Sequence, residues 1–234
     1  MRCFHGGNPA IPLSLCALWM ALAIVLNADA SATAATIPSV LASMAFSLLF
    51  WGGGAALTIT SAVGKGSCGR LRQILFEDVL PSRAAVHPGI FVIRALLTGL
   101  AALLVSAVIT YATEQVAGWA GFNLREQSVA ELFAGTTGMA KAVLIISIVL
   151  VTPVVEELFF RYAMERSLAS RTGRPLVSSI VVAMAFAAVH ANMLSFPALV
   201  AVSLIFSRAF ARSERLATPI IAHAFFNAIG LMML

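Results

Sequence analysis

The chain has 234 residues, of which 60% are hydrophobic and only 11% are charged, and its mean hydropathy is +0.96. Ordinary soluble domains carry roughly a quarter charged residues, and a soluble fold of this size cannot bury so much apolar surface, so the composition excludes a soluble protein and indicates an integral membrane protein. The net charge of +5 does not indicate a nucleic-acid partner, because the basic residues collect between apolar segments and form no stripe with interleaved aromatic residues.

Apolar segments long enough to cross ~30 Å of hydrocarbon recur along the chain. We predict about seven membrane-spanning helices (six to eight), near residues 10–26, 37–63, 89–111, 141–162, 176–190, 196–210 and 217–234. The predicted fold is an all-α, polytopic transmembrane helical bundle. Residues 1–140 supply the N-terminal spans and an inner-surface loop, and residues 141–234 form a core of four helices that holds the candidate site.

The distribution of charge predicts the orientation. With a cytoplasmic N-terminus, all of the 15 basic residues except Arg125 and Lys141 fall in segments on the inner side. Because inner loops of membrane proteins are enriched in Lys and Arg, we predict a multi-pass protein of the plasma membrane with its N-terminus in the cytoplasm. The hydropathy and the short loops favour a bacterial membrane.

Three segments between or before the spans have their own signals. The first apolar segment is expected to stay as an uncleaved helix; the alternative is a cleavable signal peptide, which the sequence from Arg2 to Ala30 resembles. Residues 64–88 are basic and contain a short amphipathic piece at 71–76 that suits the inner membrane surface. Residues 113–140 are predicted to form an outer loop carrying a short helix.

Ionisable residues inside a span cost at least ~2.5 to 3.5 kcal/mol each on insertion scales and usually mark function. Glu156 and Glu157 lie within an apolar run and, as neighbours on a helix, point in different directions. Glu157 and Arg161 have the spacing of a helical ion pair, which leaves Glu156 without a local partner. The alternatives are that the helix leaves the membrane here and the charges are solvated, or that Arg161 snorkels to the membrane edge.

Three more polar residues occur in the spans that follow. His190 ends an apolar run of small residues, where it is either a catalytic group or an interfacial hydrogen-bonding residue. His223 and Asn227 are four apart and share one face of the last span. Their side chains face a polar site or form a hydrogen bond between helices.

Together these residues are sufficient for hydrolysis of a peptide bond. Glu156 and His190 can hold and deprotonate a water molecule, and His223 and Asn227 can donate hydrogen bonds to the oxyanion of a tetrahedral intermediate. Ser195 lies near His190 in sequence, but it lacks the strand-turn-helix context and acidic partner of a serine nucleophile. Activated water is the simpler interpretation.

At these residues the chain resembles the CAAX-protease and bacteriocin-processing (CPBP, or ABI) family of intramembrane proteases, which includes the type II CAAX prenyl endopeptidases. The family motifs EExxxR, FxxxH and HxxxN correspond in order to Glu156-Glu157-x-x-x-Arg161, Phe186-x-x-x-His190 and His223-x-x-x-Asn227. The resemblance covers roughly residues 141–234. It implies that Glu156 and His190 activate water, that His223 and Asn227 stabilise the oxyanion, and that Glu157 and Arg161 orient the site.

The resemblance also implies a membrane-bound peptide or protein substrate. Prenylated CAAX proteins, bacteriocin leader peptides and unrelated membrane proteins all fit these residues. The favoured mechanism requires no cofactor. The chain lacks the zinc-binding motif HExxH, and the HxxxN motif offers no second histidine on its helix as a metal ligand. The alternative is a zinc ion bound by Glu156, His190 and His223.

Two other functions also fit these residues, and the predicted spans place Glu156 and His190 at different depths. A non-catalytic membrane scaffold would keep the fold and bind a partner, and a proton-coupled transporter would use Glu156 and the histidines as a relay. The predicted spans place His190 far from the inner charges and Glu156 close to them, unless the fifth span starts deeper, tilts or breaks.

Overall fold

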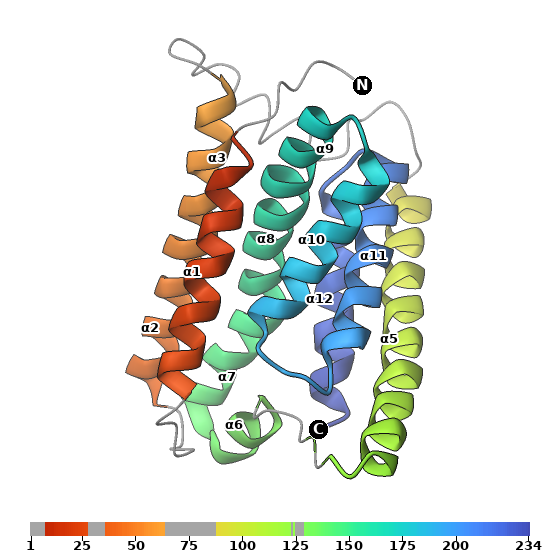
Figure 1. Cartoon of the computed structure of the whole chain (residues 1–234). Helices are drawn as coiled ribbons and strands as arrows, with labels where there is room; N and C mark the ends of the chain where they lie inside the picture. Colours follow the sequence, from red (N-terminus) through yellow and green to blue (C-terminus); the bar gives the residue numbers. More distant parts are fainter. Residues whose placement is uncertain (1–7, 28–35, 64–87, 123, 125–128) are drawn as a thin grey trace.

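The computed structural model describes residues 8–27, 36–63, 88–122, 124 and 129–234 (Figure 1). The described residues form helices and turns without strands, which confirms the predicted all-α bundle. In chain order the elements are α1 (Ala10–Asn27), α2 (Ile37–Ser47), η1 (Leu48–Gly52), α3 (Gly53–Val63), α5 (Pro88–Trp119), α6 (Val129–Gly135), α7 (Gly138–Ile146), η2 (Ser147–Val151), α8 (Thr152–Glu157), η3 (Leu158–Glu165), α9 (Arg166–Thr172), α10 (Pro175–Val189), α11 (Phe196–Ser213) and α12 (Ala217–Met232). The η elements are π-type turns within longer helices.

Every predicted span corresponds to a helix. Four helices of the described chain are long and apolar enough to cross a membrane: Ile37–Ser61, Gly89–Trp119, Gly138–Thr172 and Phe196–Ser213. The other predicted spans are shorter apolar helices, at Ala10–Trp19, Pro175–Val189 and Ala217–Met232. These shorter helices pack against the longer ones, α1 against α3, α10 against α11, and α12 against α5.

Two predicted boundaries were wrong. The third span does not end near residue 111 but continues to Trp119, so part of the predicted outer loop is helical, and α6 is the short helix expected there. The fourth span does not end near residue 162 but continues through η3 and α9 to Thr172. The signal-peptide-like segment up to residue 30 falls partly, and the amphipathic piece at 71–76 entirely, outside the described residues.

Because the fourth span is longer than predicted, the expected mismatch in membrane depth between Glu156 and His190 disappears. The helix ending at Thr172 and α10 are joined by a turn at Gly173, whose φ of +65° is readily adopted only by glycine. Glu156 precedes that turn by about 16 residues and His190 follows it by about 17, so both lie ~24 Å from it at 1.5 Å per residue. The fifth span, α10, is therefore continuous and needs no break.

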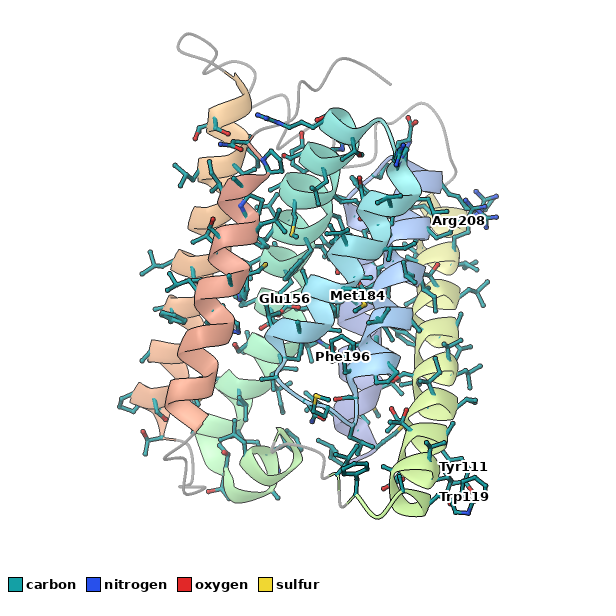
Figure 2. All side chains as sticks on the ribbon, viewed as in Figure 1. Tyr111, Trp119, Glu156, Met184, Phe196 and Arg208 are labelled. Carbon is teal, nitrogen blue, oxygen red and sulfur yellow. The ribbon has the colours of Figure 1, made fainter. Side chains whose placement is uncertain are left out.

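The outer surface of the bundle is suited to hydrocarbon. Leu49, Leu104 and Val108 are 76%, 60% and 67% exposed, as expected where lipid tails replace water. Figure 2 shows Trp119 at one end of the bundle, Arg208 at the other, and Glu156 between them. Aromatic residues and arginines are both enriched at membrane interfaces, so Glu156 lies in the middle of the membrane-spanning part.

A row of aromatic rings joins the N-terminal helices to the C-terminal helices. Trp19 of α1 packs on Trp51 of η1 with ring centroids 5.2 Å apart, Trp51 packs on Phe160 of η3 at 5.4 Å, and Phe160 packs on Phe186 of α10 at 5.2 Å. Each such pair contributes ~0.5 to 1.5 kcal/mol beyond the burial of its surface. The first helices therefore brace the helix that carries Glu156 (Figure 1).

On the opposite side of the bundle, α5 and α12 are in backbone contact at Gly99. A Cβ atom on Gly99 would lie 2.6 Å from the carbonyl oxygen of Ala222 and 2.9 Å from Cδ1 of Phe225. Small residues permit this approach of two membrane helices. Because Ala222 precedes His223, the close contact also sets the position of His223.

Substitution Gly99→Ala is expected to destabilise the bundle. The added methyl group must push α12 away, and overpacking of this kind costs about 1 to 3 kcal/mol. Thermal unfolding of the detergent-solubilised protein should show a lower midpoint for Gly99→Ala. Gly118→Ala is the matched control on the same helix, because a Cβ atom there meets nothing within 4 Å. Equal midpoints for the two variants would contradict the close contact.

Candidate active site

The carboxylate of Glu157 contacts two side chains, those of Arg161 and His223. Its Oε2 lies 3.1 Å from Nε of Arg161, four residues further along the helix, and its Oε1 lies 3.0 Å from Nδ1 of His223 on α12. The side chains of Glu157 and Arg161 are fully buried. The ion pair expected from the spacing is present, and neither the solvated helix end nor a snorkelling Arg161 describes this structure.

His223 lies between the two adjacent glutamates. Because an ionised carboxylate only accepts hydrogen bonds, Nδ1 of His223 donates to Glu157. Nε2 on the other side of the ring lies 4.0 Å from Oε2 of Glu156. The ring itself is buried against Phe206, with centroids 5.2 Å apart. The two neighbouring carboxylates therefore reach one imidazole from different directions.

Asn227 lies one turn beyond His223 and reaches a different helix. Its Nδ2 donates a 2.8 Å hydrogen bond to the carbonyl oxygen of Ile148, in the π-type turn η2. An amide group has two N–H donors, so one remains for another acceptor. The shared face predicted for His223 and Asn227 thus contacts α8 and η2, which belong to one continuous helix.

His190 ends α10 and is exposed. Its Nδ1 lies 2.7 Å from the carbonyl oxygen of Phe186. A carbonyl accepts, so Nδ1 carries the proton, and Nε2 of the neutral ring is free to accept one. The carbonyl of the preceding Val189 accepts a 2.9 Å hydrogen bond from Nε1 of Trp19, which ties this end of α10 to α1.

Phe186 connects the polar residues of the site. Its ring contacts His190 with centroids 4.8 Å apart and His223 with centroids 6.1 Å apart, and Arg161 stacks over it at 5.4 Å. Among the described residues no direct hydrogen bond or ion pair joins His190 to Glu156. Both histidines therefore contact the same aromatic ring.

The site leaves several buried polar atoms without a protein hydrogen-bond partner. Within the described part of the chain these include Oε2 of Glu156 and both Nη atoms of Arg161. Buried polar groups are almost always paired, and an exception requires a water, a ligand or a catalytic role as its explanation. Oε2 of Glu157 also lacks a hydrogen-bond partner, but Glu157 forms an ion pair with Arg161 and a hydrogen bond with His223, so Glu156 is the carboxylate available for chemistry.

The described residues do not fit the zinc alternative. No three His, Cys, Asp or Glu side chains among them converge closely enough to hold a metal ion. Of the three proposed ligands, His190 forms no hydrogen bond or ion pair with Glu156 among the described residues, and Nε2 of His223 lies 4.0 Å from Oε2 of Glu156. Ser195, at the start of α11, donates its backbone N–H to the Asn192 side chain and has no histidine partner among the described residues.

Sequence analysis missed one buried carboxylate, Glu165. Ser179 of α10 donates to its Oε1 at 2.6 Å, and Ser207 of α11 donates to its Oε2 at 2.8 Å. Glu165 joins three helices on the same side of its helix as Glu157 and Arg161, because the three residues are spaced four apart. That spacing was the available signal, but two serines on distant helices cannot be foreseen as its partners.

Residues 138–229 match the family model described as "Type II CAAX prenyl endopeptidase Rce1-like". The resemblance to the CPBP proteases is confirmed. The Rce1-like region covers less than half of the chain, but it contains all six residues proposed for the site and extends from α7 to α12. It supports a membrane peptidase as the general class of the protein. Searches of curated proteins and of solved structures gave no match.

Substitution Arg161→Met is expected to destabilise the protein strongly. It leaves the charge of Glu157 buried without its cation, and breaking a buried pair in this way costs about 3 to 5 kcal/mol. The double variant Glu157→Gln/Arg161→Met removes both charges and should recover part of the loss. Thermal unfolding in detergent distinguishes these outcomes.

Arg171→Met is the control for this pair, because Arg171 is exposed at the end of α9. Its unfolding midpoint should stay within a degree or two of the wild type, since surface substitutions usually change stability by less than ~0.5 kcal/mol. A midpoint of Arg161→Met equal to that of Arg171→Met would show that the buried pair is not needed.

Proposed function

We propose that the chain is an intramembrane endopeptidase that hydrolyses peptide bonds of membrane-associated protein or peptide substrates. The observation that supports this proposal best is that Glu156 has a buried carboxylate oxygen without a hydrogen-bond partner in the described part of the chain. Its Oε2 is buried, has no hydrogen-bond partner among the described residues, and lies 4.0 Å from Nε2 of His223. A gap of this length between two polar atoms suits a bridging water or substrate atom.

In the proposed mechanism Glu156 acts as the general base. It accepts a proton from the water as the water oxygen attacks the carbonyl carbon of the substrate. Nε2 of His190, which is free to accept a hydrogen bond, helps to orient the same water. General-base catalysis of this kind typically accelerates a reaction by about 10² to 10⁴-fold.

His223 and Asn227 stabilise the negative oxygen that this attack creates. When His223 carries two protons, Nδ1 donates to Glu157 and Nε2–H is left to donate to the oxyanion. Asn227 offers the N–H that its bond to Ile148 does not use. Donors held in place before the reaction, in a site from which water is largely excluded, are effective because they need no rearrangement as charge develops.

The tetrahedral intermediate then collapses with breakage of the carbon–nitrogen bond. Protonated Glu156 returns its proton to the leaving amine, so the products are a carboxylic acid and an amine, and water is the only co-reactant. Glu157 and Arg161 are positioning residues in this scheme, since they hold His223 and do not touch the reacting atoms. The proposed steps require only protein groups and water.

The position of Glu156 supports a substrate that enters from the membrane. Glu156 lies between the end marked by Arg208 and the end marked by Trp119 (Figure 2). A membrane-anchored peptide can present a bond at this depth without crossing into water. We place the enzyme in a bacterial plasma membrane with its N-terminus in the cytoplasm, on the distribution of basic residues.

Substitution Glu156→Gln is expected to lower the cleavage rate by at least ~100-fold, because the amide cannot accept the proton of the water. The measurement is quantitative mapping of new peptide termini in membranes from cells that express each variant at equal abundance. Termini produced only by the active protein also identify the substrate.

Glu114→Gln is the matched control, since Glu114 is an exposed residue of α5 far along the chain from the site. Its termini should equal those of the wild type. If Glu156→Gln and wild type give the same termini while both are folded and abundant, the peptidase proposal fails, and a binding scaffold becomes the better explanation.

A further inference from the structure

A second site lies between α5, α11 and the start of α12. It is a hollow of about 1090 Å³, and its polar lining is dominated by four arginines, Arg94, Arg208, Arg212 and Arg215. Figure 2 shows Arg208 at the edge of the bundle, remote from Glu156. The buried side chains of Phe206 and Ala222 belong to the packed layer where α5, α11 and α12 meet; His223 contacts Phe206 of that layer and does not line the hollow.

The charge in the hollow is unbalanced. Glu214 is the only carboxylate among its lining residues, and none of the four guanidinium groups has an ion-pair or hydrogen-bond partner within the described part of the chain. Arg208 and Arg212 are four apart on α11, a spacing at which like charges destabilise a helix. A bound anion would reverse this repulsion.

The remaining lining is largely apolar. Leu97 and Ala101 of α5 face the hollow from one side and Leu204 and Ile205 of α11 face it from the other. Leu97 is 58% exposed, so this surface is open to whatever surrounds the bundle. The hollow thus combines a strongly cationic region with an apolar flank, at the end of the bundle where the membrane interface is expected.

We propose that this hollow binds one anionic phospholipid. The phosphate contacts the arginines, and an acyl chain lies against Leu97 and Ile205. Arginine suits a phosphate because its guanidinium group donates two parallel hydrogen bonds to two oxygens. An anionic lipid matches the site in both charge and polarity, whereas a zwitterionic lipid brings a choline or ethanolamine cation toward the arginines. The bound lipid would join α5 to α11 and stabilise the contact between them.

The test compares lipid retention by the purified full-length protein. Native mass spectrometry in detergent would measure binding of phosphatidylglycerol and of phosphatidylcholine with the same acyl chains. The wild type should retain phosphatidylglycerol at least tenfold more strongly. In Arg208→Gln/Arg212→Gln, phosphatidylglycerol binding should weaken by about 25-fold, since each arginine near the membrane surface contributes roughly fivefold.

The double variant Arg171→Gln/Arg174→Gln is the matched control. It removes the same net charge from exposed positions beside the turn between α9 and α10, outside the hollow, and should retain the wild-type preference. Ala101→Trp keeps every arginine but fills the apolar flank, and it should also weaken binding. Thermal unfolding of each variant confirms that it is folded.

Equal retention of the two lipids by the wild type would overturn the proposal. So would equal losses in the Arg208/Arg212 variant and in the Arg171/Arg174 control, because lipid binding would then depend only on net charge. Cleavage by the candidate peptidase site is not part of this measurement, so the two proposals can fail separately.

Discussion

The buried ion pair between Glu157 and Arg161 constrains the rest of the C-terminal core. Both side chains are fully buried in a part of the bundle where water cannot solvate them. A charge in such a place must be neutralised by protein groups, and Glu157 reaches Arg161 along its own helix and His223 across to α12. Helix α12 is therefore held at one register relative to α8, and Glu156, the adjacent carboxylate, is left available.

The N-terminal helices contribute to the candidate site through packing. The aromatic row from Trp19 to Phe186 ends on the ring that contacts both His190 and His223. Trp19 also donates to the carbonyl of Val189, immediately before His190. Although the Rce1-like match begins only at residue 138, the earlier helices hold the residues of that region in place.

The candidate active site and the arginine-lined hollow face different physical demands. Glu156 lies in the middle of the bundle, where an unpaired acceptor is costly unless a water or substrate atom satisfies it. The arginines lie near one end of the bundle, where their charge can be solvated and attracts anionic lipid. The Phe206 and Ala222 layer keeps the two regions apart, so a lipid in the hollow would act on the site only through the positions of α5, α11 and α12.

The sequence by itself determined the fold class, the approximate spans and the identity of the polar residues, because these follow from hydropathy and from spacing along single helices. The pair at Glu157 and Arg161 is of this kind, since its partners are four residues apart. The tertiary structure decided the contacts between helices: Nδ1 of His223 binds Glu157, Asn227 binds the carbonyl of Ile148, and Ser179 and Ser207 bind Glu165. It also placed Glu156 and His190 at equal depth, through a helix that continues to Thr172. Hydropathy could not reveal this, because the charged residues that suggested a helix end are buried in the bundle, and part of their hydrogen bonding comes from helices distant in the chain.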